Sequence, residues 1–434
     1  MGGTSFAAPH ITGIVALLRQ ANPGASLQDI RSLLSANAAR VEDPPRESVI
    51  VTMPRRQSDG IDWIRKAAVY PLNKETHALI RFRDLLPFEI TGVSDPVGKG
   101  CVGKDPGRLL GIGPTGLRVE PKLETALDGS DTLILGCVDQ LGRIQKRDLL
   151  KESVEKALDH DCNVFSLLPL PESAYGDLYT RARKQGLHLF YEDVRLDDIS
   201  EAFDRPAHDI TPVDVPVLGV FGTSSQQGKF TLQLSMRRRL IREGYRVAQV
   251  GTEPHARLFG MDLVFPNGYA SPLQLPLDWH APYLDRKLGD LCASRRPDIV
   301  IVGSQSGTIP YDVDEPDTHT LPSLSFLLGT RPDACALVVN SIDPDAYIRD
   351  TIHTIGAVAK APVILLAMSD KEKHVRTAYG KTIVSPRQMT PDEIAGRLEQ
   401  LELAFGIPAI EILSEEGQSR AMETILSYYT AEAA

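Results

Sequence analysis

The segment 215-VPVLGVFGTSSQQGKFTLQLSMRRRLIRE-243 predicts a strand, a glycine-rich loop and a helix in immediate succession. The apolar run at its start is typical of a strand that is buried on both faces of a parallel sheet. Gly244 stands just past the helical run, where a helix commonly ends. A loop of this kind, with Gly222, Gly228 and Lys229 between a strand and a helix, is the usual geometry for binding a phosphate group. The segment therefore predicts an α/β domain whose loop holds an anion.

The loop departs from the plain Walker pattern GxxxxGK[ST] at two places. Five residues separate its two glycines, and Phe230 stands between Lys229 and Thr231. The order of strand, glycine, lysine, hydroxyl and helix is kept, so we expect the backbone N–H groups of Ser225 through Lys229 to surround an anion. The alternative is a strand-to-helix turn that happens to contain Gly-Lys. The predicted ligand-binding residues are Gly222, Thr223, Ser224, Ser225, Gln226, Gln227, Gly228, Lys229, Phe230 and Thr231.

Outside the loop, apolar runs alternate with helical patterns through most of the chain. Strands are predicted at 66–72, 88–95, 130–138, 162–168, 187–194, 215–222, 245–251, 297–303, 334–340, 361–367 and 407–413. Helices are predicted at 74–86, 121–127, 146–160, 171–186, 229–243, 390–406 and 418–429. Such alternation favours parallel sheets covered by helices on both faces. The predicted fold class is α/β, with a Rossmann-like and then a P-loop NTPase-like three-layer domain.

The predicted boundaries follow shifts in composition. Residues 1–42 have two helical patterns, and 43–62 form a linker rich in proline and arginine. Residues 63–211 form the Rossmann-like domain, and 212–434 form the P-loop domain.

Composition narrows the class of protein. The chain has 434 residues, 42% of them hydrophobic, and a formal net charge of −10. The negative charge argues against nucleic acid or an anionic membrane as a partner. No apolar run reaches the length of a membrane span, and the start lacks the pattern of a secretory signal. We expect a small-molecule substrate and leave open a homo-oligomer.

The pattern of cysteines favours a cytoplasmic protein without disulfides. The five cysteines are scattered and never spaced as CxxC. We expect reduced thiols, a cytoplasmic protein and no metal site built from them.

Several motifs resemble known P-loop proteins. The loop GTSSQQGKFT resembles the GT(x)nGKxT loop of the branch that holds dethiobiotin synthetase. The order of the motifs resembles a P-loop family long catalogued as a domain of unknown function, whose characterised member is a D-glutamate N-acetyltransferase that uses acetyl-CoA. The other matching segments are SDTLILGCVDQLGRI (130–144), VAQVGTEPHARLFG (247–260), DIVIVGSQSGTIP (298–310) and LLGTRPDACALVVN (327–340). The resemblance covers residues 65–430 and implies a Rossmann-like half before a P-loop half.

Departures from that family bear on the ligand. Gly303 and Ser224 stand where relatives place acids. A Mg²⁺ ion would have to use Glu253, Asp298 or hydroxyl groups, so no metal site is predicted, and the loop better suits an anion held without metal. The phosphates of coenzyme A are such an anion. Bound ATP with Mg²⁺ is the alternative ligand.

The resemblance implies transfer of an acyl group from acyl-CoA to the amine of an amino acid or a similar small substrate. Such a transfer needs a base for the amine and a donor for the developing oxyanion. We expect Gln305, with Ser306 and Thr308, to supply donors, and His255, two residues after Glu253, to act as the base. The predicted catalytic residues of this site are Gln305, His255 and Glu253. The alternative function is that of an ATP-dependent ligase or kinase of the dethiobiotin-synthetase type.

Two further patterns favour ordinary structure over ligand binding. Arg237, Arg238 and Arg239 could hold a 3′-phosphate, but three adjacent helical residues point in different directions, which favours a solvated face. The segment GKGCVG (98–103) has the form GxGxxG, but the residues after it do not predict a helix. A dinucleotide-binding fingerprint needs that helix, so a glycine-rich loop is predicted.

The first residues have a separate resemblance. GGTSFAAPHITGIVALLRQANPGAS (2–26) resembles the nucleophile segment of subtilisin-like serine peptidases, which makes Ser5 the nucleophile. A serine nucleophile needs a histidine base and an aspartate, which in that family lie upstream. We therefore expect a peptidase remnant, or a truncated or fused peptidase with an accessory nucleotide-binding P-loop domain. Peptidase activity of this chain alone is not expected.

Overall fold

The computed structural model describes residues 60–194, 213–267, 273, 275–310, 320–378 and 381–432. They belong to one compact unit, Gly60–Ala434. The predicted helical segment 1–42, Ser5 and most of the linker lie outside the described residues. Among the helices that are described, none is long and apolar enough to cross a membrane.

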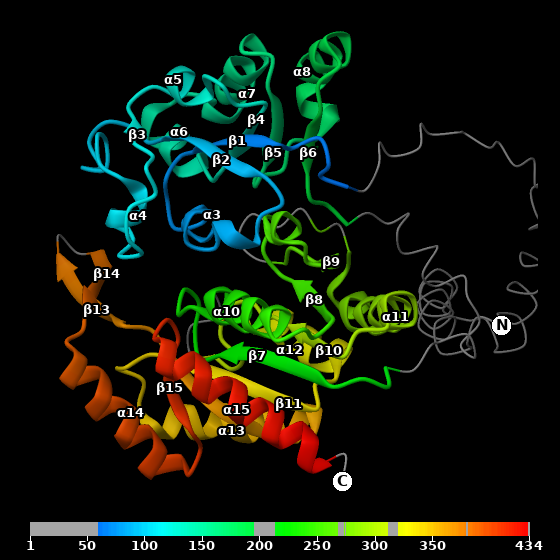
Figure 1. Ribbon diagram of the computed structural model, residues 1–434, viewed down its shortest axis with the longest axis vertical. Helices are drawn as coiled ribbons and strands as arrows, with labels where there is room; N and C mark the ends of the chain where they lie inside the picture. Colours follow the sequence, from blue (N-terminus) through cyan, green and yellow to red (C-terminus); the bar gives the residue numbers. More distant parts are fainter. Residues whose placement is uncertain are drawn as a thin grey trace, which may run out of the picture. The chain divides into compact units, whose positions relative to one another are not determined.

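A six-stranded parallel sheet forms the first half of this unit (Figure 1). Its strands are β1 (Lys66–Tyr70), β2 (Glu89–Ser94), β3 (Val119–Glu120), β4 (Thr132–Leu135), β5 (Asn163–Ser166) and β6 (Leu189–Tyr191), in the order β3-β2-β1-β4-β5-β6. This is the doubly wound order of Rossmann-like sheets. The direction of winding reverses between β1 and β4, and ligands of such sheets bind beyond the strand ends at that point.

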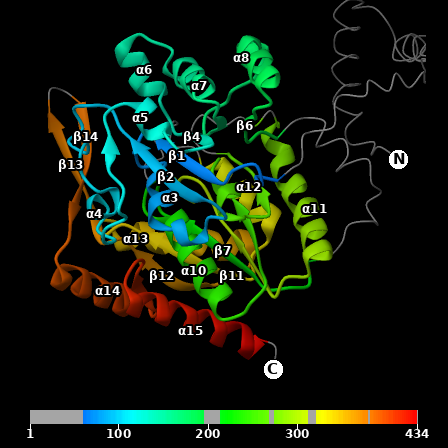
Figure 2. The same ribbon diagram turned by 45° about the horizontal axis from the view of Figure 1, so that its top comes forward.

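Alternating residues of β1 face the two sides of the first sheet. Ala68 belongs to a hydrophobic cluster with residues of α5 (Leu123–Leu127), α7 (Leu149–Asp159) and α8 (Glu172–Gln185). Ala67 and Val69 pack on the other side, against α3 (His77–Arg81) and against apolar residues of the second half. Figures 1 and 2 show α7 and α8 on the outer side of the sheet, away from the second half. The short helices α4 (Pro106–Leu109) and α6 (Asp139–Gln145) and the 3-10 turn η1 (Arg83–Leu85) complete this half.

The second half is a seven-stranded parallel sheet with the order β15-β12-β11-β7-β10-β8-β9. Its strands are β7 (Val217–Gly222), β8 (Val247–Gly251), β9 (Leu263–Val264), β10 (Ile299–Val302), β11 (Ala334–Val339), β12 (Val363–Met368) and β15 (Ala409–Glu411). Helices α10 (Lys229–Arg242) and α15 (Glu415–Glu432) pack on one face. Helices α11 (Leu277–Arg295), α12 (Leu321–Thr330), α13 (Asp345–Ala359) and α14 (Pro391–Phe405) pack on the other. The two parallel three-layer sheets confirm the predicted fold class.

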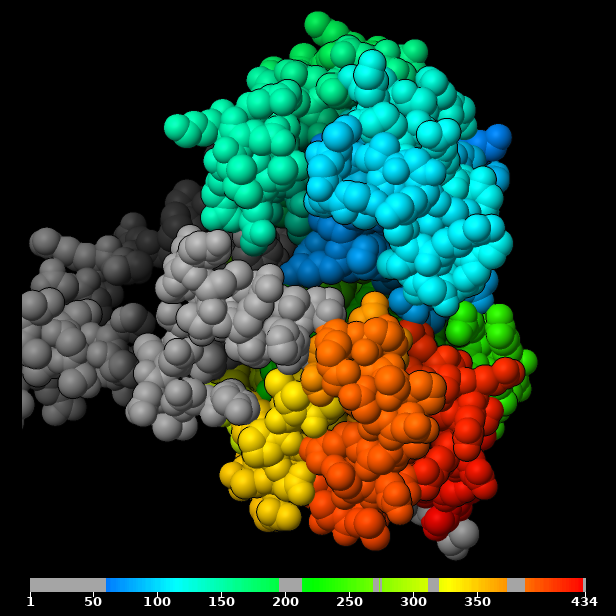
Figure 3. Space-filling view, turned by 90° about the vertical axis from the view of Figure 1, so that its left-hand side faces the viewer, coloured from blue at the N-terminus to red at the C-terminus, as the bar shows by residue number. Residues whose placement is uncertain are grey.

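The two halves share one hydrophobic cluster. Leu79, Phe82 and Phe165 of the first half pack with Leu234 of α10 and Phe259 of the 3-10 turn η3 (Ala256–Phe259). In the space-filling view of Figure 3, the blue and cyan residues of the first half lie directly against the orange and red residues that follow β12.

Ion pairs reinforce this contact between the halves. The Arg257 guanidinium pairs with the buried Glu192 carboxylate, and Arg242 Nη2 donates to Asp84 Oδ2 at 3.1 Å. These ion pairs add polar contacts to the shared hydrophobic cluster.

The structure corrects several predicted elements. The helix predicted at 74–86 is divided into α3 and η1. A four-residue helix, α4, does follow the segment GKGCVG, because Asp105 caps it by accepting from Gly107 N at 2.8 Å and Arg108 N at 3.2 Å. Helices α6, α11, α12 and α13 and the antiparallel hairpin of β13 (Lys371–Ala378) and β14 (Lys381–Gln388) were not predicted.

Candidate functional site

The glycine-rich loop joins β7 to α10 at the carboxyl edge of the second sheet, between β10 and β11. Gly228 caps α10 with φ of 105°, and Gln226 has φ of 57°, so the chain turns sharply twice within the loop. A Cβ atom on Gly222 would lie 2.9 Å from both Gln227 Oε1 and Lys229 Cδ. Glycine is therefore required where the Lys229 stem passes the end of the strand.

Lys229 lies in the mouth of this loop. Its side chain is buried, and its Nζ donates to Ser224 O at 2.7 Å and to Ser306 O at 2.8 Å. The ammonium thus connects the loop after β7 with the segment after β10. Ser225 and Gln226 are exposed at the tip. A positive charge held at the start of a helix is suited to phosphate binding.

A buried network fixes the start of the loop. Gln227 Oε1 accepts from Ser224 N at 2.8 Å, and its Nε2 donates to Thr223 Oγ1 at 2.5 Å. The Thr223 hydroxyl donates in turn to the Asp343 carboxylate. Asp343 also accepts from Asn340 N at 2.8 Å and from Asn340 Nδ2 at 3.0 Å. These contacts hold the loop in shape through neighbouring β11.

A tyrosine completes the support. The hydroxyl of Tyr347, on α13, lies 2.6 Å from Thr223 O and 2.8 Å from Ile309 O. Sequence reasoning missed Asn340, Asp343 and Tyr347. The available signal was the pattern N-x-x-D directly after the predicted strand 334–340, since parallel strands end at the same edge of a sheet.

Glu253 and Gln305 lie together at the ends of β8 and β10. Gln305 Nε2 donates to Glu253 Oε1 at 2.8 Å and to Thr252 O at 3.2 Å. Burial raises the pKa of the Glu253 carboxyl, while the Gln305 hydrogen bond and the positive charge of Lys229 oppose that rise. Two of the predicted catalytic residues are thus brought beside the loop lysine.

His255 has different surroundings. It is 3% exposed and contacts Phe230, with ring centroids 4.8 Å apart, and Phe259, with centroids 5.9 Å apart. Within the described residues, neither ring nitrogen has a hydrogen-bond partner. Burial lowers the pKa of His255 to about 3, so its imidazole is a weak base. The structure places His255 and Phe230 in the aromatic cluster between the halves, and it shows no hydrogen bond from His255 to Glu253 or Gln305.

The other predicted oxyanion donors contribute to the structure of the site. Thr308 is buried, and its N and Oγ1 both donate to Gly222 O, at 2.8 Å and 3.0 Å. Ser306 has φ of 59° and offers its carbonyl to Lys229. Thr231 is half-buried on the first turn of α10. Of the predicted donors, Gln305 is therefore the one that donates to Glu253.

The position of the missing acid is filled by another side chain. A Cβ atom on Gly303 would lie 2.5 Å from Gln233 Nε2 of α10. Gln233 is fully buried and accepts from Gln249 Nε2 at 3.4 Å. Two amides thus occupy the space beside the loop where relatives are expected to have a carboxylate.

Asp298 does not belong to the site. It precedes the first residue of β10, at the edge of the sheet opposite the loop, and it pairs with Arg246 at 2.6 Å. It is therefore wrong as a candidate magnesium ligand. The described residues contain no cluster of three or more histidine, cysteine or acidic side chains arranged to hold a metal ion.

The arginine run is only partly a solvated face. Arg237 is 9% exposed and donates to Gly260 O at 2.7 Å and to Val247 O at 3.4 Å. Burial lowers the pKa of its guanidinium. Arg238 lies over the Phe82 ring, 5.1 Å from its centroid, and Arg239 pairs with Glu243 at 2.7 Å. The interpretation as a solvated face is wrong for Arg237, which ties α10 to the neighbouring segments.

The first half contributes the end of its own sheet. Asn73 Nδ2, beyond β1, donates to Cys137 O, beyond β4, at 3.1 Å, which marks the point where the winding reverses. Burial, together with the charges of Glu75, Asp139 and Glu253, raises the pKa of the Cys137 thiol to about 12. Glu75 also raises the pKa of Glu253. The ligand-binding edge of the first sheet and the loop edge of the second therefore both reach Glu253.

The fold and the loop define a P-loop α/β protein with a Rossmann-like first half. Residues 204–421 match the family described as a domain of unknown function, the DUF1611_C P-loop domain. The match spans half of the chain, so the chain belongs to this family. A crystal structure of a DUF1611 family protein from Anabaena variabilis is similar in fold, with a TM-score of 0.59 and 16% identity over 84% of this chain and 99% of that chain.

Three other comparisons cover less of the chain. Residues 1–62 match the subtilase family. The subtilisin-like protease SBT3.7 of Arabidopsis thaliana is 34% identical over 113 residues, which cover 24% of this chain and 14% of that protease. An ADP complex of a nucleotide-binding protein from Archaeoglobus fulgidus has a TM-score of 0.30 at 14% identity over 46% of this chain and 82% of that chain. At that score the likeness says nothing specific about this chain.

Proposed function

We propose that the loop 222–231 binds the phosphates of acyl-CoA and that the acyl group passes to the amine of an amino acid or similar small substrate. The observation that carries the proposal is the position of Glu253. Its carboxylate lies within electrostatic reach of Lys229 and of Lys74 and Glu75, and it is held by Gln305. The reaction is thereby assigned to the space between the phosphate loop and the first sheet.

The chemistry follows from these groups. The substrate amine attacks the thioester carbonyl, the C–S bond breaks, and the coenzyme thiolate leaves. Glu253, whose pKa is raised by burial, accepts a proton from the amine, and the Gln305 amide donates to the developing oxyanion. Holding the amine beside the carbonyl supplies a large part of the acceleration. In this proposal Glu253 replaces His255 as the base, because the pKa of His255 is too low.

Calorimetry with acetyl-CoA and with ATP and Mg²⁺ tests the ligand. We expect acetyl-CoA to bind and Lys229→Ala to lose that binding. Release of free thiol from acetyl-CoA, measured with a panel of D- and L-amino acids, then tests transfer, and Glu253→Gln should abolish it. Tight binding of ATP and Mg²⁺ without binding of acetyl-CoA would refute acyl transfer in favour of the ligase or kinase.

A second candidate is a subtilisin-like peptidase with an accessory nucleotide-binding P-loop domain. It is favoured by the subtilase match at residues 1–62, which includes Ser5. Hydrolysis of a chromogenic subtilisin substrate, with Ser5→Ala as the control, tests it. Hydrolysis that is lost in Ser5→Ala would support the peptidase, and equal rates in both proteins would exclude it.

A further inference from the structure

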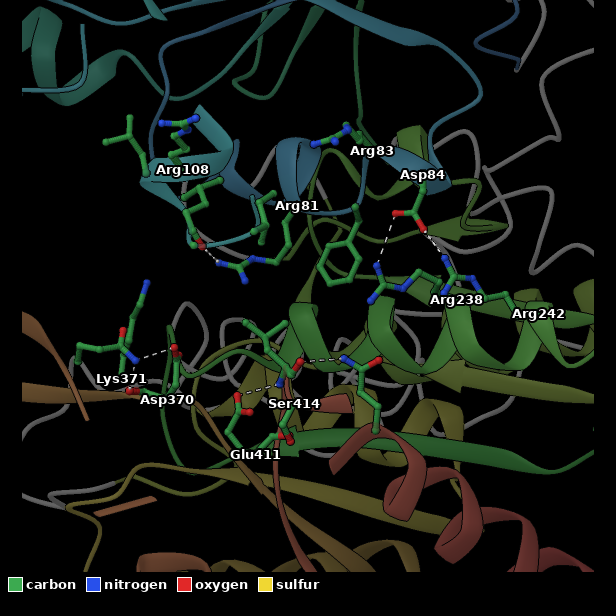
Figure 4. Close-up of a pocket in the computed structure, with 18 residues that line it drawn as sticks. Arg81, Arg83, Asp84, Arg108, Arg238, Arg242, Asp370, Lys371, Glu411 and Ser414 are labelled. Atoms are coloured by element: carbon green, nitrogen blue, oxygen red, sulfur yellow. Dashed lines mark hydrogen bonds and ion pairs between the residues drawn. The ribbon is translucent and has the colours of Figure 1, made fainter. Parts of the chain in front are cut away.

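A second cavity lies where the two halves meet, apart from the groups assigned above. It has a volume of about 740 Å³ and is bounded by α3, η1 and α4 of the first half and by α10 and the ends of β12 and β15 of the second (Figure 4). This is the size of an ordinary small-molecule site. Its charged lining residues are Arg81, Arg83, Arg108, Arg238, Arg242, Lys371, Asp84, Asp370 and Glu411. Six cationic side chains thus face three carboxylates.

The three carboxylates compensate only part of this positive charge. Asp84 is held by the two arginines of α10, Arg238 and Arg242. Asp370 Oδ2 accepts from Gln388 Nε2 at 2.8 Å, and Glu411 Oε1 accepts from Leu413 N at 2.9 Å. Asp84 is therefore paired across the cavity with α10, whereas Asp370 and Glu411 accept hydrogen bonds from residues of the second half.

Two cations remain directed at the cavity. Figure 4 shows the Arg81 guanidinium and the Lys371 ammonium reaching towards each other from opposite walls. Among the described residues, Arg81 donates only to Leu110 O, at 3.3 Å, and Lys371 Nζ has no hydrogen bond or ion pair. Arg81 is half-buried, and that burial lowers the pKa of its guanidinium, while the charges of Asp370 and Glu411 oppose this fall without forming an ion pair with it. A half-buried guanidinium with most of its five donors unused is a site for an oxyanion.

A neighbouring histidine reports the same positive potential. His77 is half-buried on α3, and its pKa falls to about 4. Burial is the largest cause, and the charges of Lys371, Arg81 and Lys99 lower it further. The excess of positive charge therefore extends over this part of the cavity wall.

The cavity begins next to the phosphate loop. A Cβ atom on Gly228, the cap of α10, would lie 3.0 Å from Ile412 Cδ1, and the next residue, Leu413, lines the cavity. Leu413 also packs in the same cluster as Phe230 of the loop. A ligand with one phosphate in the loop can thus extend directly into the cavity.

We infer that this cavity is a second anion site, in which Arg81 and Lys371 hold a phosphomonoester at the far end of the ligand bound by the loop. The inference rests on the proposed function, because in coenzyme A that group is the 3′-phosphate. Arg81 offers a planar pair of N–H donors and Lys371 a mobile point charge, which together match the oxygens of a phosphate. The six-to-three balance of charges gives the site its preference for anions.

Calorimetry with coenzyme A and 3′-dephospho-coenzyme A tests the inference. The wild type should bind coenzyme A about 10-fold more tightly than the dephospho form, since loss of one charge-assisted contact has roughly this effect. Lys371→Ala and Arg81→Gln should each remove that difference by weakening coenzyme A alone. Arg83→Ala is the matched control, because it removes an equal charge from the same cavity wall and its guanidinium lies above and apart from those of Arg81 and Lys371 in Figure 4.

A further measurement separates this inference from the proposed function. Adenosine 3′,5′-bisphosphate is titrated into Lys229→Ala, in which the loop is disabled and the cavity is intact. We expect weak binding that the added change Lys371→Ala removes. Equal affinity of the wild type for coenzyme A and its dephospho form would overturn the second site while leaving the loop assignment standing. Absence of coenzyme A binding together with retained bisphosphate binding would overturn the proposed ligand and keep the anion site.

Discussion

The phosphate loop and the cavity beside it place positive charge in opposite ways. Lys229 is buried and bonded to two carbonyl groups, and the loop around it is fixed by Thr223, Gln227 and Asp343. Lys371 is exposed and, among the described residues, has no partner for its ammonium. The loop is therefore built before its ligand arrives, while the cavity completes its contacts only with a ligand. We therefore expect substitutions in the loop to affect both folding and binding, and substitutions in the cavity to affect binding alone.

Lys229→Ala should give the largest effect. Loss of a buried, hydrogen-bonded charge at a binding site weakens binding by about 100-fold or more. Calorimetry with acetyl-CoA measures the change, and Lys184→Ala, at an exposed lysine on α8, is the control. Undiminished binding in Lys229→Ala would show that the loop does not bind the ligand.

Asp343→Ala should come next and should act on stability as well. It leaves the buried Thr223 hydroxyl and the Asn340 N–H without their acceptor, which costs about 3 kcal/mol. Urea unfolding measures the loss, with Asp350→Asn, at an exposed position of the following helix α13, as the control. If unfolding is unchanged while binding weakens, the loop is not prebuilt and the contrast with the cavity fails.

His255 should make stability depend on pH. The unfolded chain takes up a proton at the ordinary pKa of 6.5, whereas the folded protein does so only near 3. The contribution of His255 to the free energy of unfolding is therefore fully present above pH 6.5. It is lost as the pH falls towards 3, and the loss is about 2 kcal/mol at pH 5. His255→Leu should lose less stability than the wild type between pH 7 and pH 5 in urea titrations. Equal losses in the two proteins would show that the shared cluster between the halves does not exclude water.

Lys371→Ala should give the smallest effect on folding. Exposed side chains without partners change stability by less than about 0.5 kcal/mol when they are replaced. Thermal unfolding at low and high salt measures this, and relief of repulsion from Arg81 should make any gain larger at low salt. A clear loss of stability would instead assign Lys371 a structural role. The cavity would then resemble the loop, where residues affect folding as well as binding.

Local features of the sequence were sufficient to predict the loop and the sheets. Strand, glycines, lysine and helix follow one another within the segment 215–243, so their arrangement needs no distant contact. The unpredicted helices lacked such a signal. The segment LPSLSFLLGT of α12 is apolar nearly all round, and α11 contains Pro282 in its interior. Neither has the polar and apolar faces on which helix prediction depends.

The contacts that set the chemistry of the site could not be predicted. Thr223 and Asp343 are 120 positions apart and meet only because β7 and β11 are neighbours. His255 becomes a poor base only because Phe230 and Phe259 surround it. Burial and pairing of this kind are products of the tertiary fold, so residue type and spacing alone could not show that the imidazole of His255 is a weak base.

Gly303 and Gln233 have a consequence for the history of the chain. An acid introduced at 303 would collide with the Gln233 amide, which α10 presses against the end of β10. An acid at position 303 therefore requires the Gln233 side chain to move away or to be replaced by a smaller one. Relatives that have an acid at the position of Gly303 should accordingly have a smaller or differently placed side chain at the position of Gln233.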